Sequence, residues 1–281
     1  MATDSADGSA QPELFGGNPR PAEVQPLFTS SKSPEEYATQ WDVLWKDGKT
    51  PWDRGGPSMA LNDLLLEFPE VFSPPFEGKR ALVPGAGRGH DVLLLASFGF
   101  DAYGLDHSAT SSKASRENEE KNKGLDVYST KGTKQGKVTW LTGDYFSYDF
   151  SDIGPFDLIF DYTFLCAIYF EMRPKWSKAM KRNLAPTGKL VCLEFPTRKS
   201  TSVQSTPLAL PSIVYESLLA RPGERIPYGK EHAVDVKNLG PESPDRLVRL
   251  KHFTPKRTHK VGYDEESNVT DRISVWSHNN S

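Results

Sequence analysis

The sequence has few of the features that would tie it to secretion, membranes or metals. Its two cysteines, Cys166 and Cys192, lie inside apolar stretches, which predicts two core residues and a reducing compartment such as the cytoplasm. No apolar run approaches the length of a membrane span, and the polar, acidic first ten residues are unlike a signal peptide. The six histidines have no metal-ligand spacing, so we expect no metal. A net charge of −3 gives no electrostatic reason to expect nucleic acid or a membrane as a partner.

Length and composition predict one large domain. The chain has 281 residues, of which 37% are hydrophobic and 25% charged, values that supply an ordinary core. Residues 1–32, rich in Pro, Gly and Ser, are expected to form a flexible N-terminal arm, and residues 33–281 a single domain. We expect that domain to be a monomer.

Strand and helix patterns alternate through the middle of the chain. Apolar runs bounded by turn residues predict parallel strands, because a sheet covered by helices on both faces needs continuous apolar strands. A helix is predicted from Ser33, with Pro34 at its first turn, and another around 58–68. The remaining predicted elements are strands at 80–84, 102–105, 138–141, 156–160 and 190–195 and helices at 90–98, 107–123 and 173–184.

Two segments near the C-terminal end depart from this rhythm. Residues 197–240 are rich in Ser, Pro and Gly, and we interpret them as an insertion that forms a lid over the site. Residues 247–253 and 272–278 predict an antiparallel strand pair that closes the sheet. The basic run 251–260 is read as a solvated surface in preference to a phosphate-binding patch.

A glycine-rich loop follows the first predicted strand. Gly85, Gly87 and Gly89 permit a tight turn and the approach of a ligand to bare backbone. The dinucleotide fingerprint G-x-G-x-x-G would place its third glycine at His90, so the spacing here favours a nucleoside without a pyrophosphate. An ordinary strand–helix turn is the alternative.

Two acidic residues follow the next two strands. Asp106 ends the second predicted strand, where a carboxylate can accept hydrogen bonds from both ribose hydroxyls; its alternative role is a helix cap. Asp144, after the third strand, is a candidate acceptor for an adenine amine, with Tyr145 or Phe146 against the ring. A plain turn is the alternative at that position.

The chain resembles the thiopurine methyltransferase family, and more closely its plant and fungal thiol/thiocyanate/halide branch. The similarity covers nearly all of residues 41–196. The matching blocks are WDVLWKDGKTPWDRGGP (41–57), ALVPGAGRGHDVLLLASFGFDAYGLDHS (81–108), GDYFSYDF (143–150), FDLIFDYTFLCAIYFEMRPKW (156–176) and LAPTGKLVCLEFP (184–196). The resemblance implies a Rossmann-like class I methyltransferase: a mostly parallel seven-stranded sheet with helices on both faces and S-adenosyl-L-methionine as cofactor.

The resemblance also assigns residues to the cofactor site. Three tryptophans would line the pocket, where indole faces attract a sulfonium cation; their alternative role is core packing. Asp161 and Tyr162 would approach the methionine end and the transferring methyl, with Tyr162 as a positioning residue that packs on the cofactor or donates a hydrogen bond to a thiolate. The full set is Trp41, Trp45, Trp52, Gly85, Gly87, Asp106, Asp144, Tyr145, Asp161 and Tyr162.

The resemblance and the pocket sequence point to a small soft nucleophile as acceptor. Thiopurine-methylating relatives carry an arginine at the Tyr162 position, and its replacement favours small thiols, thiocyanate or halides. A thiol with a pKa of about 8.5 is partly ionised at neutral pH, so a dedicated base is optional. One alternative is an N- or O-methyltransferase, which would need a base; a histidine or carboxylate within 200–240 would support it. The others are an NAD-dependent oxidoreductase and a non-catalytic cofactor-binding module.

Overall fold

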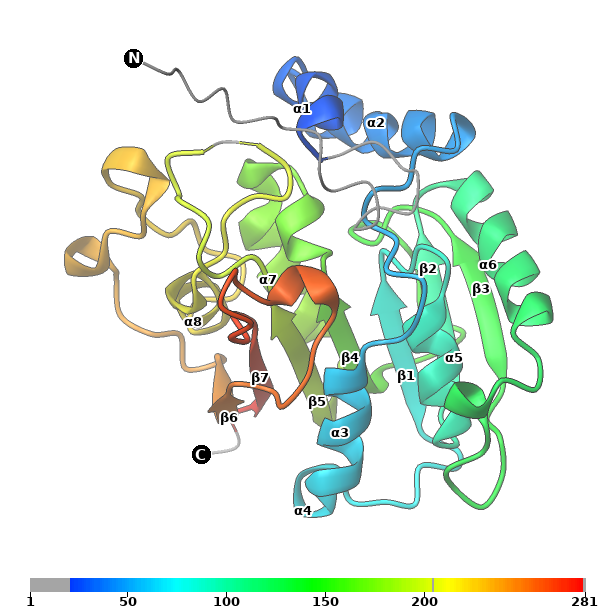
Figure 1. Ribbon diagram of the computed structural model, residues 1–281. Coiled ribbons are helices and arrows are strands. Elements are labelled where there is room, and N and C mark those ends of the chain that lie inside the picture. The colour runs from blue at the N-terminus through cyan, green and yellow to red at the C-terminus, as the bar shows by residue number, and fades with distance from the viewer. Residues whose placement is uncertain (1–20, 204, 280–281) are drawn as a thin grey trace.

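The central sheet of the protein is mixed and mostly parallel (Figure 1). The computed structural model describes residues 21–203 and 205–279, whose seven strands have the order β3-β2-β1-β4-β5-β7-β6. Strands β1 to β5 pair in parallel, and β7 is antiparallel to both β5 and β6, as predicted. The strands are β1 (Arg80–Pro84), β2 (Asp101–Asp106), β3 (Val138–Thr142), β4 (Phe156–Tyr162), β5 (Leu184–Glu194), β6 (Leu247–Phe253) and β7 (Arg272–His278).

Helices cover both faces of this sheet. On one face α3 and α5 bury their leucines in a cluster that includes Leu158 and Phe160 of β4. On the other face α7 and α8 contribute Trp176 and Tyr215, two of the largest fully buried side chains. The α-helices are α1 (Pro21–Thr29), α2 (Pro34–Lys46), α3 (Met59–Glu67), α4 (Pro69–Phe72), α5 (His90–Ser97), α6 (Ala109–Lys121), α7 (Arg173–Asn183) and α8 (Ser212–Leu219). Short 3₁₀ turns are η2 (Asp126–Tyr128), η3 (Leu165–Ala167), η4 (Phe170–Met172), η5 (Lys230–His232), η6 (Val236–Asn238) and η7 (Lys260–Gly262).

The N-terminal segment differs from its prediction where it is described. Residues 1–20 of the expected arm lie outside the described residues. Residues 21–29 form α1, which buries Val24 and Phe28, one helical turn apart, and the Phe28 ring lies 4.4 Å from that of Trp41. Burial of this i, i+4 apolar pair against α2 explains why the segment is helical despite its prolines. Figure 1 shows α1 and α2 lying across the carboxyl ends of β1 and β2.

The 197–240 segment is only partly irregular. Its residues 212–219 form α8, which is the helix between β5 and β6 and packs into the core through Val214, Tyr215 and Leu218. The segment before α8 approaches α2, because the Tyr37 and Thr206 hydroxyls form a buried hydrogen bond. The segment therefore contains a core helix, and its interpretation as an insertion that forms a lid stays a prediction.

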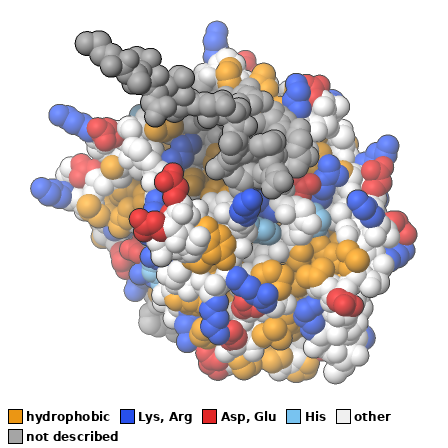
Figure 2. All heavy atoms as spheres, in the orientation of Figure 1, with side chains coloured by type: hydrophobic (Ala, Val, Ile, Leu, Met, Phe, Trp, Pro, Cys, Tyr) orange, Lys and Arg blue, Asp and Glu red, His pale blue; other side chains and the backbone are white. Residues whose placement is uncertain are grey.

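The basic run 251–260 belongs to a surface of mixed charge. Lys251, Lys256 and Arg257 pair with carboxylates of α3 and α4, as the prediction of a solvated surface implies. Figure 2 shows basic and acidic side chains interspersed over this face of the molecule. Among the described residues no helix is long and apolar enough to cross a membrane.

Candidate active site

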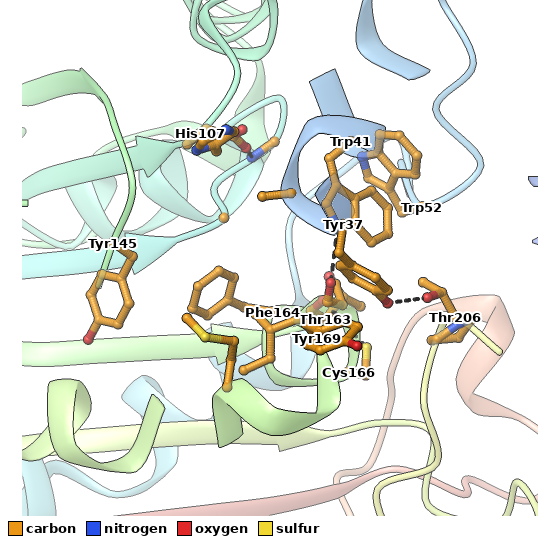
Figure 3. Close-up of a pocket in the computed structure, with 18 of the residues that line it drawn as sticks. Tyr37, Trp41, Trp52, His107, Tyr145, Thr163, Phe164, Cys166, Tyr169 and Thr206 are labelled. Atoms are coloured by element: carbon orange, nitrogen blue, oxygen red, sulfur yellow. Dashed lines mark hydrogen bonds between the residues drawn. The ribbon is translucent and has the colours of Figure 1, made fainter. Parts of the chain in front are cut away.

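A cavity of about 440 Å³ lies where the parallel strands end. It is lined by the loops after β1, β2, β3, β4 and β5 and roofed by α2 and the 50–57 loop. Its size is within the range of about 300–1,000 Å³ that small-molecule sites occupy. Figure 3 shows His107, Tyr145 and Phe164 toward one end and Cys166, Tyr169 and Thr206 toward the other.

The glycine loop after β1 forms part of the wall. Gly85 has a φ of 62°, and a Cβ atom there would lie 2.6 Å from the Phe164 ring. Any other residue would therefore strain the backbone and displace the phenyl group, so Gly85 is required by both conformation and space. Gly87 lies against Trp45 and also lines the cavity. The predicted close approach of backbone to a ligand is sterically open at Gly87, whereas the Phe164 ring fills the space beside Gly85.

The Asp106 carboxylate connects the glycine loop to the start of α6. One oxygen accepts from the Gly87 amide and the other from the Ser108 amide, each at 3.0 Å. The cap of α6 is Ser108, whose hydroxyl accepts from the Ser111 amide, so the helix-cap alternative for Asp106 is wrong. Burial raises the pKa of Asp106, against the hydrogen bonds that lower it. Each oxygen accepts one backbone hydrogen bond and has a further lone pair.

Three tryptophans gather at the roof of the cavity. Trp41 and Trp45, four residues apart on α2, both contact Trp52 edge-on, with ring centroids 5.0 and 5.7 Å away. The Trp41 indole N–H donates to the Ala167 carbonyl at 3.0 Å, which fixes the ring. All three line the cavity, so core packing and a site role are combined in one cluster.

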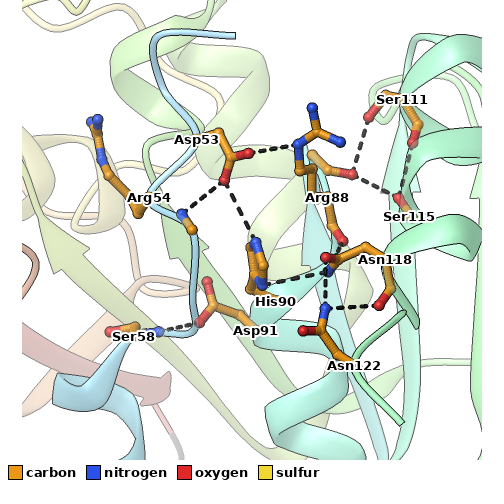
Figure 4. A network of polar contacts seen from close by, with 12 residues as sticks. Asp53, Arg54, Ser58, Arg88, His90, Asp91, Ser111, Ser115, Asn118 and Asn122 are labelled. Atoms are coloured by element: carbon orange, nitrogen blue, oxygen red, sulfur yellow. Dashed lines mark hydrogen bonds and ion pairs between the residues drawn. The ribbon is translucent and has the colours of Figure 1, made fainter. Parts of the chain in front are cut away.

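A polar network that the sequence reading missed holds the 50–57 loop in place (Figure 4). The Asp53 carboxylate accepts from Arg88 Nε at 2.5 Å and from the Gly55 amide at 2.9 Å, and lies 3.5 Å from His90 Nε2. Burial would raise the pKa of Asp53, but its contacts with His90, Gly55 and Arg88 outweigh burial and lower it to about 2. The network fixes neighbouring Trp52 relative to the glycine loop. Asp53, Arg88 and His90 stand next to residues that the sequence flagged, yet their pairing depends on tertiary contact.

Asp144 and Tyr145 follow β3 and line the cavity. Asp144 accepts from the Phe146 amide and the Ser147 hydroxyl, at 3.1 and 3.0 Å, as a turn residue would. Tyr145 is buried, and its hydroxyl contacts the Met180 sulfur at 3.2 Å. Its ring lies edge-on to Phe164, with centroids 5.5 Å apart.

Asp161 and Tyr162 require a correction, because neither lines the cavity. Side chains alternate along β4, so Asp161 enters one core face and Tyr162 the other. The Asp161 oxygens accept from the Trp176 indole at 2.7 Å and the Leu165 amide at 3.3 Å, and burial raises its pKa to about 6. Tyr162 is buried and stacks on His259 at 5.4 Å. The next two residues, Thr163 and Phe164, line the cavity in their place.

The end of the cavity near Phe195 has lining that sequence reasoning missed. Residues from five separate places in the sequence meet there, which no local pattern could reveal. Cys166, read from sequence as an inert core residue, is among them, and burial raises the pKa of its thiol to about 12. The residues are Arg54, Thr163, Cys166, Phe195, Thr206, Pro207 and Val261.

Ionisable groups are sparse in the cavity wall. Among the described lining residues the carboxylates are Glu35, which is exposed, Asp106 and Asp144, and the one histidine is His107. From residues 200–240 the wall receives Thr206 and Pro207, neither a base. The described part of the chain contains no cluster of His, Cys, Asp and Glu that could hold a metal ion.

Comparison with known proteins assigns the family. The model of the family described as thiopurine S-methyltransferase matches residues 37–242. The chain belongs to this family. It is 34% identical over 221 residues to the probable thiol methyltransferase 2 of Arabidopsis thaliana, covering 77% of this chain and 86% of that protein. It is 37% identical over 156 residues to thiocyanate methyltransferase 1 of Brassica oleracea, covering 56% of this chain and 61% of that protein.

A solved structure agrees with the fold. The N-methyltransferase NodS from Bradyrhizobium japonicum WM9, in complex with S-adenosyl-L-homocysteine, superposes with a TM-score of 0.50 at 13% identity. The match covers 78% of this chain and 86% of that one. The protein is therefore a class I methyltransferase that uses S-adenosyl-L-methionine, and the dinucleotide oxidoreductase alternative is set aside.

Proposed function

We propose that the enzyme methylates a small soft sulfur nucleophile, a thiolate or a thiocyanate-like anion. The observation that carries the proposal is the chemistry of the cavity end near Phe195. Among the described lining residues, Asp106, His107 and Asp144 follow β2 and β3, and Glu35 is exposed on α2. The Cys166 thiol stays protonated because burial raises its pKa to about 12. An acceptor bound there has to be a nucleophile without help from a protein base. A thiol with a pKa of about 8.5 satisfies this condition, whereas amides and alcohols do not.

The opposite end of the cavity fits the adenosine part of the cofactor. Asp106 can accept further hydrogen bonds from ribose hydroxyls. Burial raises its pKa and so destabilises the carboxylate form, and such hydrogen bonds would stabilise that form. We assign Gly85 and Gly87 to backbone contacts, and Asp144 and Tyr145 to the adenine end. The three tryptophans are assigned to the sulfonium region, since indole faces attract cations by about 0.5–2 kcal/mol each.

When bound, S-adenosyl-L-methionine supplies a methyl group whose bond to the sulfonium sulfur breaks, leaving its electron pair on that sulfur, as the acceptor sulfur forms its own bond to carbon. The residues of this chain orient the acceptor and exclude water. Placement of reacting groups can supply about 7–11 kcal/mol of the barrier reduction. Trp41, Tyr37 and Thr206 form a fixed wall, since each is hydrogen-bonded across segments far apart in the sequence.

The alternative of a nitrogen or oxygen acceptor has less support. It requires a general base, and the 200–240 segment, where one was expected, lines the cavity with Thr206 and Pro207. His232 of that segment instead contacts the Phe170 ring, at 5.6 Å between centroids.

The test is a panel of acceptors with radiolabelled methyl donor: small thiols, thiocyanate, iodide, a thiopurine, and amide and phenol controls. We expect label on thiols and thiocyanate and none on the amide or phenol. Transfer to nitrogen or oxygen alone would contradict the proposed acceptor class. Inability to bind S-adenosyl-L-homocysteine in calorimetry would contradict the cofactor assignments and support a non-catalytic module with an altered site.

We also propose that the protein is a cytoplasmic monomer with small molecules as its partners. The two free, buried cysteines and the interspersed surface charges support this proposal. Light scattering after gel filtration should give about one chain mass of 31.3 kDa. A dimer mass would contradict it, and DNA or RNA retention at physiological salt would contradict the absence of a nucleic-acid partner.

A further inference from the structure

Two arginines beside the cavity, Arg54 and Arg88, differ in whether a carboxylate pairs with them. Arg88 is neutralised by Asp53 at 2.5 Å and lies over the Trp45 ring. Arg54 lines the cavity, and no carboxylate of the described residues forms an ion pair with it. Figure 4 shows its side chain extending away from the Asp53 network.

The contacts of Arg54 leave part of its guanidinium group unused. One terminal nitrogen donates to the Pro51 carbonyl at 3.2 Å, and the group lies 5.8 Å from the centroid of Phe195. Its Nε is buried and has no hydrogen-bond partner within the described residues. A guanidinium has five N–H donors, so one bond to a carbonyl leaves most of its capacity free.

None of the titratable groups around Arg54 among the described residues forms an ion pair with it. Burial, with help from the Arg54 charge, lowers the pKa of His259 to about 4, so that ring is neutral. Burial raises the pKa of Tyr162 and of Cys166, so both are protonated. Burial raises the pKa of Asp271 to about 6, so this carboxylate is still largely ionised at neutral pH; its Oδ2 accepts from the Thr258 hydroxyl. No ion pair joins Asp271 to Arg54 within 4.0 Å in the described structure.

An unpaired guanidinium in an apolar wall is costly unless a ligand compensates it. The Arg54 guanidinium lies over the Phe195 ring, and Pro207 and Val261 are further apolar residues of the cavity lining. Weakly hydrated, polarisable anions are the ligands that such a combination of one positive charge and apolar surface suits best. The cavity end assigned to the acceptor thus contains one positive charge, that of Arg54, which can pair with an anionic acceptor.

We propose that Arg54 is the specificity-determining residue that binds the methyl acceptor as a small monovalent anion. The inference rests on the proposed function and adds the charge state of the acceptor and the residue that recognises it. The acceptor enters with one negative charge and leaves as a neutral methylated product, so Arg54 attracts the substrate and releases the product. Tyr162 lies outside the cavity wall, and the Arg54 charge opposes the effect of burial on its pKa.

This role of Arg54 predicts how KM and kcat should respond to its removal. The acceptor loses charge on the way to the transition state, so its attraction to Arg54 is strongest before reaction. Removal of the guanidinium should therefore raise KM for the acceptor at least tenfold without lowering kcat. A merely structural arginine would lower kcat and stability together.

The test is calorimetry on the full chain with sodium thiocyanate as probe, in sulfate buffers of matched ionic strength. Wild type, Arg54→Gln, Arg54→Lys and the control Arg116→Gln, an exposed arginine of α6, are first saturated with S-adenosyl-L-homocysteine. We expect thiocyanate to bind Arg54→Gln at least tenfold more weakly than wild type, and Arg54→Lys at an intermediate level. Neutral methyl thiocyanate should change less than twofold in any variant.

The cofactor's own carboxylate is the competing partner for Arg54, and the same experiment distinguishes it. If Arg54→Gln weakens S-adenosyl-L-homocysteine tenfold but leaves thiocyanate unchanged, the proposal is overturned. Equal thiocyanate binding by Arg54→Gln and wild type overturns it too, as does a wild-type complex that binds no thiocyanate. If wild type does not bind S-adenosyl-L-homocysteine, the proposed function itself fails. Thermal unfolding of each variant verifies that it is folded, and Arg54→Lys keeps the test valid if the glutamine variant is not.

Discussion

Replacement of Asp106 by alanine should weaken cofactor binding and, separately, destabilise the protein. The carboxylate accepts two backbone N–H groups, from Gly87 and Ser108, each at 3.0 Å. Leaving both donors unsatisfied costs about 1–3 kcal/mol of folding stability. The loss of hydrogen bonds from ribose hydroxyls to a charged acceptor adds about 1.5–3 kcal/mol to the binding free energy. That range corresponds to a roughly 10- to 150-fold larger Kd.

The assay is calorimetric titration of S-adenosyl-L-homocysteine into wild type, Asp106→Ala and Ser108→Ala, at a temperature where all are folded. Ser108→Ala is the matched control, because it removes the cap of α6 at a cost of about 1 kcal/mol in stability. It should leave the Kd within about threefold of wild type, a change below 1 kcal/mol. Equal Kd values for Asp106→Ala and wild type would refute the ribose assignment. Equal weakening by both variants would show that loop order alone sets the affinity.

Three further predictions follow from the same structure. Trp52→Leu should weaken binding of cationic S-adenosyl-L-methionine by about 0.5–2 kcal/mol more than binding of neutral S-adenosyl-L-homocysteine, and equal weakening in calorimetry would contradict a cation–π role. Asp53→Asn should lower the free energy of unfolding at pH 7 by about 1–2 kcal/mol. Since the folded pKa of Asp53 is about 2, this wild-type advantage is present above pH ~4 and lost toward pH 2, as urea unfolding would measure. Asp161 has the opposite sign, because its folded pKa of about 6 lies above the unfolded value. The stability that protonated Asp161 contributes is complete below pH ~4 and is lost as pH rises through 6. The free energy of unfolding of Asp161→Asn should therefore rise by roughly 1–3 kcal/mol relative to that of wild type between pH 4 and 7. A difference that does not change with pH would contradict burial as the cause.

The parts of the site that local backbone chemistry dictates could be predicted from sequence. The glycine loop and Asp106 lie at the ends of two strands that continuous apolar residues identify in the sequence. Because parallel strands bring their carboxyl ends to one edge of the sheet, the two features are expected to lie close together. Trp41 and Trp45 share a helix face by their spacing alone. Asp161 and Tyr162 were misplaced, although strand alternation through Ile159 and Phe160 already directs them into the two core faces.

The rest of the site depends on contacts between distant segments. Arg54 and Asp53 are adjacent in sequence, yet one faces the cavity and the other pairs with Arg88 and His90. The sequence could not distinguish these two roles, because a loop has no regular alternation of inward and outward side chains. The helix α1 was missed because Pro26 and its proline-rich surroundings outweighed the apolar pair at Val24 and Phe28. Its stability comes from burial against α2, which only the fold supplies.

The central claim is that the acceptor arrives as a sulfur anion and that the protein supplies no base. The pH dependence of kcat/KM for methyl transfer tests it most directly, with thiocyanate and with two thiols of different solution pKa. For each thiol the value should rise tenfold per pH unit below that thiol's own pKa and then level, while the thiocyanate value should be flat from pH 6 to 9. A single enzyme pKa that governs all three acceptors alike would contradict the claim.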